Sequence, residues 1–187
     1  ATMEHDINNG EYNSLVKVDA NTVALAYTSS SNWGYIKTFT IPADGSSITE
    51  VNSYKHDGIQ GKYNSFVQAD SNTYVLAYAG SGNDGYIKTF TIPTSGATIT
   101  QVKKLEHDNK RGEHNSLSKI SGGTDSYVLA YAGHDTDVGS AYDGFIKTFT
   151  IPADGSTVTQ TYVLEHAIGQ GEWNSLIQID EDSFVLG

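Results

Sequence analysis

Hydrophobic and polar positions recur along the chain in one order and at a nearly fixed spacing. An aromatic or imidazole ring is followed by Asn-Ser four times, and a Gly-Tyr/Phe-Ile-Lys-Thr-Phe-Thr-Ile-Pro stretch appears three times. The asparagines of the first motif lie 51, 51 and 59 residues apart, at Asn13, Asn64, Asn115 and Asn174. Self-similarity at a fixed period of this length predicts a repeat architecture.

Each repeat contains four segments with the pattern of β-strands, as the first copy illustrates. The first segment, residues 15–18, follows Asn-Ser. Residues 23–27 are almost continuously apolar, which predicts a strand buried on both faces. Residues 35–41 alternate large side chains with threonine, the period of a strand. Residues 48–54 are polar, as in a solvated edge strand. Turn-forming residues separate the segments, and no segment long enough to form a helix shows helical periodicity.

A repeat of about 50 residues with four antiparallel strands, the second fully buried, resembles the blade of a β-propeller. The resemblance covers nearly the whole chain and implies an all-β fold. It is to propeller repeats in general, because the third strand ends in Ile-Pro where WD40 repeats have Trp-Asp. A β-helix is the alternative, but it would need shorter coils and would not tolerate such polar fourth strands.

The 187 residues are enough for one domain of ordinary size. We expect a single domain, 1–187, with repeats at 7–57, 58–108 and 109–167 and a partial repeat at 168–187. Residues 2–6 read as the tail of a fourth strand, and the last repeat stops after two strands. We therefore expect three complete blades and a partial blade shared by the two termini, within one chain or in a homodimer. A piece of a longer array is the alternative, and the number of blades in a closed ring stays open.

Composition excludes several partners and chemistries. Asp and Glu outnumber Lys and Arg by 22 to 11, and a net charge of −11 repels nucleic acid. No apolar run reaches the roughly 18 residues of a membrane helix, so no membrane insertion is expected. The chain has no cysteine, which removes disulfides, thiol catalysis and zinc–thiolate sites. An acidic, lysine-poor surface rich in Thr, Ser, Asn and Tyr favours an extracellular or cell-surface location.

The propeller resemblance implies that the connections from fourth to first strand and from second to third strand lie on one rim. The repeated rings and amides would gather there, together with the loop residue Trp33. A planar ring beside an amide suits stacking on a sugar face and hydrogen bonding of its hydroxyls. The alternative is that the rings pack between blades and that Asn-Ser only caps turns. The candidate ligand-binding residues are Tyr12, Asn13, Tyr63, Asn64, His114, Asn115, Trp173, Asn174 and Trp33.

A histidine recurs near the end of every fourth strand, in three copies followed by aspartate. Its recurrence in every repeat favours a structural role, a hydrogen bond to Ser or Asp within the blade. Metal binding or acid–base work by a His-Asp pair is the alternative. A lysine that recurs in the third strand is expected to balance neighbouring acids. The residues concerned are His5, His56, His107 and His166, and Lys37, Lys88 and Lys147.

One loop carries acids at a spacing similar to the calcium loops of integrin-type propellers. Asp135, Asp137 and Asp143 stand at relative positions 1, 3 and 9, where hard oxygen ligands wrap one ion. The loop departs from that pattern at Gly139, which replaces an acid, and at Ser140, which replaces the usual glycine. Ca²⁺ is thus the only candidate cofactor, and a solvated acidic loop is the alternative.

Sequence motifs of catalysis are missing. There is no Ser-His-Asp order with nucleophile context, no glycine-rich phosphate loop and no paired-carboxylate signature. Near-identical repeated sites favour a non-catalytic binding or scaffold module for a glycan or protein ligand. The alternative is a propeller hydrolase or lactonase with His and Asp in its central channel. Equivalent shallow pockets between blades would favour binding, and a single convergent cluster of His, Asp or Glu would favour an enzyme.

Overall fold

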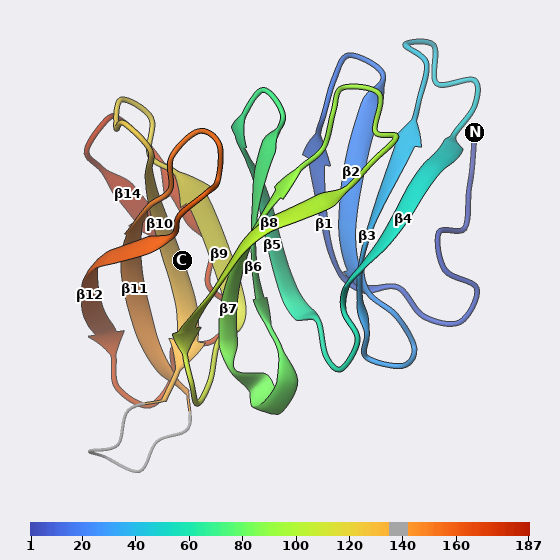
Figure 1. Ribbon diagram of the computed structural model, residues 1–187. Helices are drawn as coiled ribbons and strands as arrows, with labels where there is room; N and C mark the ends of the chain where they lie inside the picture. The colour runs from blue at the N-terminus through green and yellow to red at the C-terminus, as the bar shows by residue number, and fades with distance from the viewer. Residues whose placement is uncertain (135–141) are drawn as a thin grey trace.

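The computed structural model describes residues 1–134 and 142–187, and almost all regular structure in this part is β-strand (Figure 1). Its one helix is a three-residue 3₁₀ turn, Ser81–Asn83. Within the described residues, no helix has the length and apolar character needed to cross a membrane. The predicted all-β fold is confirmed.

The strands form three antiparallel four-stranded sheets, which we call blades 1 to 3, and a two-stranded half-blade, each in sequence order. Blade 1 contains β1 (Glu11–Lys17), β2 (Thr22–Thr28), β3 (Gly34–Thr40) and β4 (Thr49–Asp57). Blade 2 contains β5 (Lys62–Asp70), β6 (Thr73–Ala79), β7 (Gly85–Thr91) and β8 (Thr100–Asp108). Blade 3 contains β9 (Glu113–Lys119), β10 (Ser126–Gly133), β11 (Asp143–Thr150) and β12 (Thr159–Ala167). The half-blade contains β13 (Leu176–Gln178) and β14 (Phe184–Leu186).

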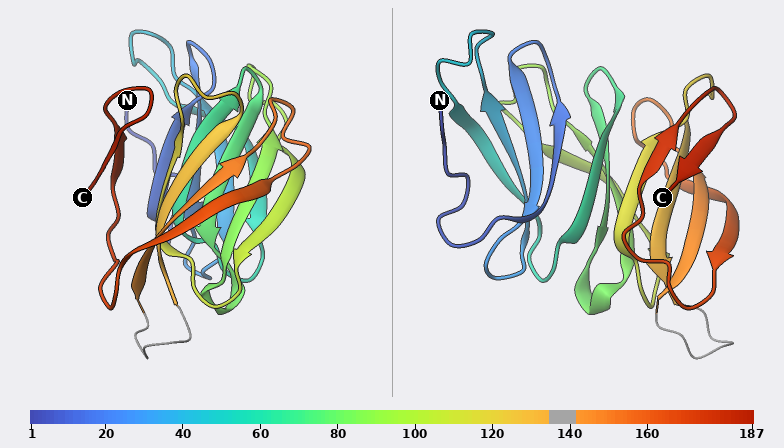
Figure 2. Two further views of the ribbon diagram at one scale, coloured as in Figure 1. Left: turned by 90° about the vertical axis from the view of Figure 1, so that its left-hand side faces the viewer. Right: turned by 180° about the vertical axis from the view of Figure 1, so that it is seen from behind.

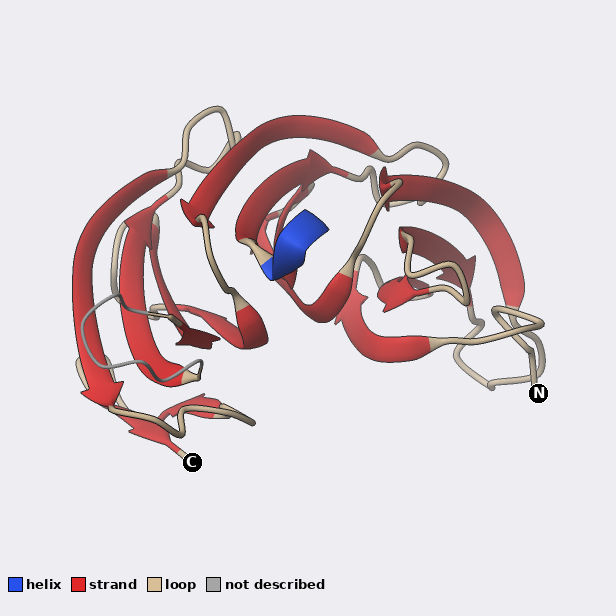
Figure 3. Cartoon of the chain, turned by 90° about the horizontal axis from the view of Figure 1, so that it is seen from below, coloured by secondary structure: helices blue, strands red, loops and turns tan. Residues whose placement is uncertain are grey.

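The blades stand side by side in an open arc (Figure 3). The first strands, β1, β5 and β9, approach one another on the inner side of the arc, whereas β4, β8 and β12 form its outer side. Every residue of β6 is buried, and nearly every residue of β12 is exposed. The burial predicted for the second strands is thus confirmed for β6 and β10, whereas Val23 and Leu25 of β2 are half-buried because no blade covers that face. The solvation predicted for the fourth strands is confirmed.

The core lies between the blades, not within any one of them. Ala24 and Ile36 of blade 1 pack against Leu76 and Phe90 of blade 2. A second cluster repeats this arrangement between blades 2 and 3. Because a sheet of four strands cannot bury its own faces, each blade depends on its neighbours for the hydrophobic contribution to stability.

The two termini lie at opposite ends of the arc (Figure 2). Residues 2–6 form no strand, and β13 and β14 pair only with each other. The prediction that the termini share a blade within one chain is therefore wrong. The reason is that the N-terminal segment packs on blade 1: the His5 ring lies 4.8 Å from that of Tyr27, and Lys37 donates to the His5 carbonyl. At the interface of blades 1 and 2, His56 of the fourth strand β4 makes the same two contacts, with Tyr78 and Lys88. The N-terminal segment therefore takes the place of a fourth strand beside blade 1. A ring of two chains stays a prediction.

Deleting residues 1–6 is expected to lower the melting temperature. The deletion removes the contacts of His5 and uncovers an apolar hollow lined by Leu15, Leu25 and Phe39. Thermal unfolding measures this change, and sedimentation velocity shows whether the full chain forms a dimer that the deletion dissociates. An unchanged melting temperature would show that the segment does not stabilise blade 1.

The Tyr78→Phe variant is expected to lose about 1.5–3 kcal/mol of unfolding free energy, the usual worth of a hydrogen bond to a charged group. The buried Tyr78 hydroxyl donates to Asp57 Oδ2 across the blade interface at 3.0 Å. Urea unfolding measures the loss. The exposed Tyr162 on β12 provides the control, since Tyr162→Phe should change stability by less than about 0.5 kcal/mol. Equal effects of the two substitutions would contradict the structural role of this bond.

Candidate functional site

The repeated ring stands at a backbone irregularity at the inner rim of each blade. Tyr12, Tyr63, His114 and Trp173 have left-handed φ values of 51°, 52°, 52° and 59°. In blades 1 to 3 a shift of register accompanies the ring, as between Glu11 and Ser14. Left-handed backbone is uncommon for bulky residues and marks a constrained position. The irregularity turns the ring out of the strand's regular alternation.

A close approach of two glycines holds this irregularity in place. Gly61, two residues before Tyr63, lies so close to Gly34 that a side chain on Gly61 would meet the Gly34 backbone. The Gly61 N–H donates to the carbonyl of Asn32 at 2.8 Å, and both later blades repeat the bond. The fourth-to-first connection is therefore fixed on the second-to-third turn of the same blade, as the resemblance implied. The glycine two residues before each ring is the signal of this close approach in the sequence.

The four rings form a continuous row along the inner rim, which we call the ring row. The ring centroids of Tyr12 and Tyr63 are 4.4 Å apart, those of Tyr63 and His114 4.3 Å, and those of His114 and Trp173 4.4 Å. Trp173 ends the row with 77% of its surface exposed. Together with the asparagines that follow them, the rings line one hollow of about 220 Å³. The structure thus gathers eight of the nine candidate residues, and their binding of a ligand stays a prediction.

The asparagines and serines of the motif join neighbouring blades. Asn64 Nδ2 donates to the Tyr12 carbonyl of blade 1 at 3.2 Å and to the Gly61 carbonyl at 3.0 Å. Ser65 Oγ accepts from the backbone N–H of Leu117 in blade 3 at 2.9 Å. The same bonds recur at the other interfaces. The Asn-Ser motif therefore has a structural role, and this role is wider than the capping of turns, since the motif also joins neighbouring blades.

A charged group beside the ring row was missed by the sequence reasoning. Arg111 Nη1 pairs with Glu113 Oε2 at 3.1 Å, and His114 Nε2 lies 3.7 Å from Glu172 Oε1. Burial raises the pKa of the Glu113 carboxyl and lowers the pKa of the His114 imidazole. The available signal was the departure from the repeat at Arg111, where the blade before has Gln60. The Arg111–Glu113 pair balances its own charge near the rings, whereas His114 and Glu172 form an ion pair only when the imidazole is protonated.

The repeated histidines are packing residues. Both ring nitrogens of His56 and of His107 are buried and have no hydrogen-bond partner in the described part of the chain. Their rings stand edge-on to Tyr78 and Tyr131 in the next blade, at 4.8 and 4.9 Å. The expected hydrogen bond to Ser or Asp is therefore wrong. Burial lowers the pKa of each imidazole to about 3, so acid–base work by these two histidines has no support.

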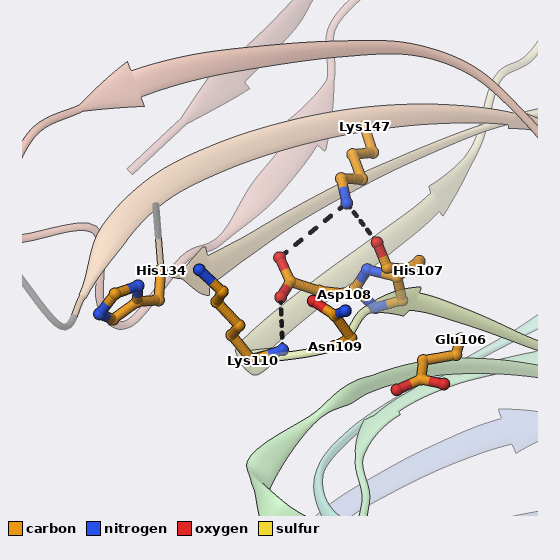
Figure 4. A pocket seen from close by; sticks show the side chains of 7 residues that line it. All are labelled: Glu106, His107, Asp108, Asn109, Lys110, His134 and Lys147. Carbon is orange, nitrogen blue, oxygen red and sulfur yellow. Dashed lines mark hydrogen bonds and ion pairs between the residues drawn. The ribbon is translucent and has the colours of Figure 1, made fainter. Parts of the chain in front are cut away.

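The repeated lysines bind the carbonyl of the buried histidine in the neighbouring blade. Lys147 Nζ donates to the His107 carbonyl and lies 4.0 Å from Asp108 Oδ2 (Figure 4). Asp108 also accepts a backbone hydrogen bond from Lys110 at 3.0 Å. These groups line an open hollow of about 510 Å³ between blades 2 and 3. The arrangement agrees with the charge-balancing role expected for the lysines.

The calcium prediction lies mostly outside the described residues, because Asp135 and Asp137 fall in 135–141. Asp143 begins β11, where its Oδ1 accepts from the Gly169 N–H at 2.6 Å. Among the residues that the structure describes, no three His, Asp or Glu side chains are grouped so as to hold a metal ion. Calcium binding stays a prediction.

Trp33, the ninth candidate, lies apart from the ring row. It belongs to the turn between β2 and β3, and it lines a separate hollow of about 370 Å³ between the N-terminal segment and blade 1. Lys55 Nζ stands 3.4 Å from the centroid of its ring system, a cation–π contact.

The fold of this chain is similar to that of solved structures of other proteins. One is Sqt1 of Saccharomyces cerevisiae, with a TM-score of 0.58 and 11% identity over 97% of this chain and 43% of that one. Another is the periplasmic gluconolactonase PpgL of Pseudomonas aeruginosa, with a TM-score of 0.58 and 13% identity over 92% of this chain and 41% of that one. The fold is a β-propeller. The chain spans less than half of either protein, and identity this low shows the fold alone. No protein-family model and no curated protein matches the sequence.

Propeller stability is expected to fall as the pH decreases from about 6.5 towards about 3. His56 and His107 stay neutral in the folded state down to about pH 3, whereas unfolded histidine takes up a proton below about pH 6.5. The unfolded state then binds more protons, so each histidine removes up to about 1.4 kcal/mol per pH unit in that window. Urea unfolding at about pH 6 and about pH 5 measures the slope. His107→Leu should reduce the slope, and an unchanged slope would assign the effect to other groups.

Proposed function

We propose that this propeller is a non-catalytic binding module and that its ligand is a neutral carbohydrate chain lying along the ring row. The observation that carries the proposal is the unbroken contact of four rings on the inner rim, ending in the exposed indole of Trp173. Exposed aromatic surface of this kind binds the apolar face of a sugar, and the flanking polar groups bind its hydroxyls.

The size and charge of the site support this ligand class. The hollow of about 220 Å³ is smaller than the roughly 300–1,000 Å³ of pockets that enclose drug-sized ligands. A hollow of this size suits one unit of a chain whose next unit lies against the exposed indole of Trp173. The net charge of −11 disfavours anionic polysaccharides, so the ligand should be neutral.

A hydrolase or lactonase role has less support. His56 and His107 are buried away from solvent, and the acids near the ring row, Glu113 and Glu172, face Arg111 and His114. A catalytic acid or base would need to reach a bound substrate. Repeated contacts of similar geometry instead suit a ligand with repeated units. A protein ligand is the second candidate occupant of the same row.

Replacing Trp173 by alanine is expected to weaken glycan binding by at least about tenfold, or about 1.4 kcal/mol. The indole is exposed, so its loss should leave the melting temperature almost unchanged. A glycan array followed by calorimetric titration of the best neutral ligand measures the effect. Tyr162→Ala, an exposed aromatic on the outer strand β12, is the matched control.

Equal affinity of Trp173→Ala and the unaltered chain for a glycan would contradict the proposal. An array without any hit would also contradict it. Loss of a protein partner in the Trp173→Ala variant, with no glycan bound, would identify the ring row as a protein interface.

A further inference from the structure

We propose that blade 1 carries a second binding site, separate from the ring row, which takes a single neutral sugar residue. The site is the hollow of about 370 Å³ between the N-terminal segment and the turn of β2 and β3, which we call the blade 1 hollow. Its lining and that of the ring row have no residue in common. The inference goes beyond the proposed function, because it does not depend on ligand binding at the ring row.

Aromatic side chains form one side of the blade 1 hollow. Trp33 is 37% exposed and is held by Lys55 Nζ over its ring, and Tyr35 is half-buried. The Tyr35 ring is stacked on that of Tyr27 with centroids 5.8 Å apart and planes 21° apart. These contacts fix the rings before a ligand arrives, which lowers the entropic cost of binding. Flat apolar rings of this kind fit the C–H face of a sugar.

Polar groups that suit sugar hydroxyls form the rest of the lining. Burial raises the pKa of Asp6, but backbone bonds from Asn8 and Asn9, the Tyr27 hydroxyl and the charge of Lys37 outweigh it, so its pKa is lowered. Asp6 is therefore an ionised acceptor at neutral pH, and Lys37 supplies a donor within the same hollow. An acceptor and a donor together match the two hydroxyls of a vicinal diol.

Ser29 gives an independent indication of a ligand. Its side chain is 7% exposed, it lines the hollow, and its Oγ has no hydrogen-bond partner in the described part of the chain. An unpaired buried hydroxyl costs about 1–3 kcal/mol. The Ser29 Oγ has almost no accessible surface, so a sugar hydroxyl becomes its partner by displacing the groups that cover it.

Blade 1 departs from the repeat at the Ser29 position of this hollow. In blade 2, Gly80 stands at the position of Ser29, and a Cβ there would lie 2.5 Å from the ring of Tyr86. Gly133 of blade 3 has the same relation to Phe145. A serine therefore keeps the following ring from covering this position, which agrees with the greater exposure of Tyr35 than of Tyr86.

The charge of the blade 1 hollow selects a neutral sugar. Lys37 Nζ is already paired with Glu50 Oε2 at 3.0 Å and donates to the His5 carbonyl at 2.8 Å. Together with Asp6, these contacts leave no net positive charge for an anionic ligand. A sugar with a free pair of neighbouring hydroxyls and no carboxylate or sulfate fits the lining.

The chain contains only two tryptophans, so fluorescence separates the two sites. In a Trp173→Phe variant the emission reports on Trp33 alone, and in a Trp33→Phe variant it reports on Trp173 alone. Methyl glycosides of neutral hexoses are the probes for the blade 1 hollow. We expect a saturable change of Trp33 emission in the Trp173→Phe variant.

Adding Ser29→Gly to the Trp173→Phe variant should weaken this binding by at least about tenfold, because the Tyr35 ring can then cover the position as Tyr86 does. Asp6→Asn should also weaken it, by removing the charged acceptor. The melting temperature serves as the control, since Gly80 shows that glycine fits here in blade 2.

Two outcomes would overturn the inference: no saturable response of Trp33 to any neutral methyl glycoside, or a response that Ser29→Gly and Asp6→Asn both leave unchanged. A response of Trp173 alone would overturn the blade 1 site and leave the proposed function standing. A response of Trp33 alone would support the blade 1 site and contradict glycan binding at the ring row.

Discussion

Burial of both faces of a second strand holds the arc together wherever a blade lies between two neighbours, as β6 and β10 show. β6 is buried along its whole length, and the apolar clusters on its two sides belong to two different blade interfaces. No blade could bury these faces alone. The polar contacts follow from the same stacking, because it places equivalent residues of successive repeats side by side. Thus Lys88 and Tyr78 find their partners, His56 and Asp57, in the preceding blade.

The ring row is a consequence of this stacking. The inner strands approach most closely, and the repeat places one left-handed ring residue at the start of each. Neighbouring rings therefore meet at nearly constant separations of 4.3–4.4 Å, whether the ring is Tyr, His or Trp. The Asn-Ser steps maintain the spacing through bonds between blades. Features that stabilise the fold thus also build a surface of aligned rings.

Polar and charged groups that belong to one blade alone occur where that blade differs in sequence from the others. Ser29 and Trp33 stand where blade 2 has Gly80 and Asp84, and they line a hollow with an unpaired hydroxyl. Arg111 replaces Gln60 and brings an ion pair to the ring row. Because the shared positions are committed to packing between blades, the variable turns and connections are free to acquire binding groups.

The four-stranded repeat, the buried second strand and the exposed fourth strand could be predicted from the sequence, since each follows from local periodicity. The sequence also indicated that the ring and amide positions would lie together, because they stand at one place in every repeat. Only the tertiary structure decided the partners: His56 packs on a tyrosine of the next blade, and the Asn64 amide bonds to a carbonyl more than 50 residues away. It also separated the two termini. The physical reason is that periodicity specifies strands, whereas contacts between repeats depend on how the sheets stack and at what angle.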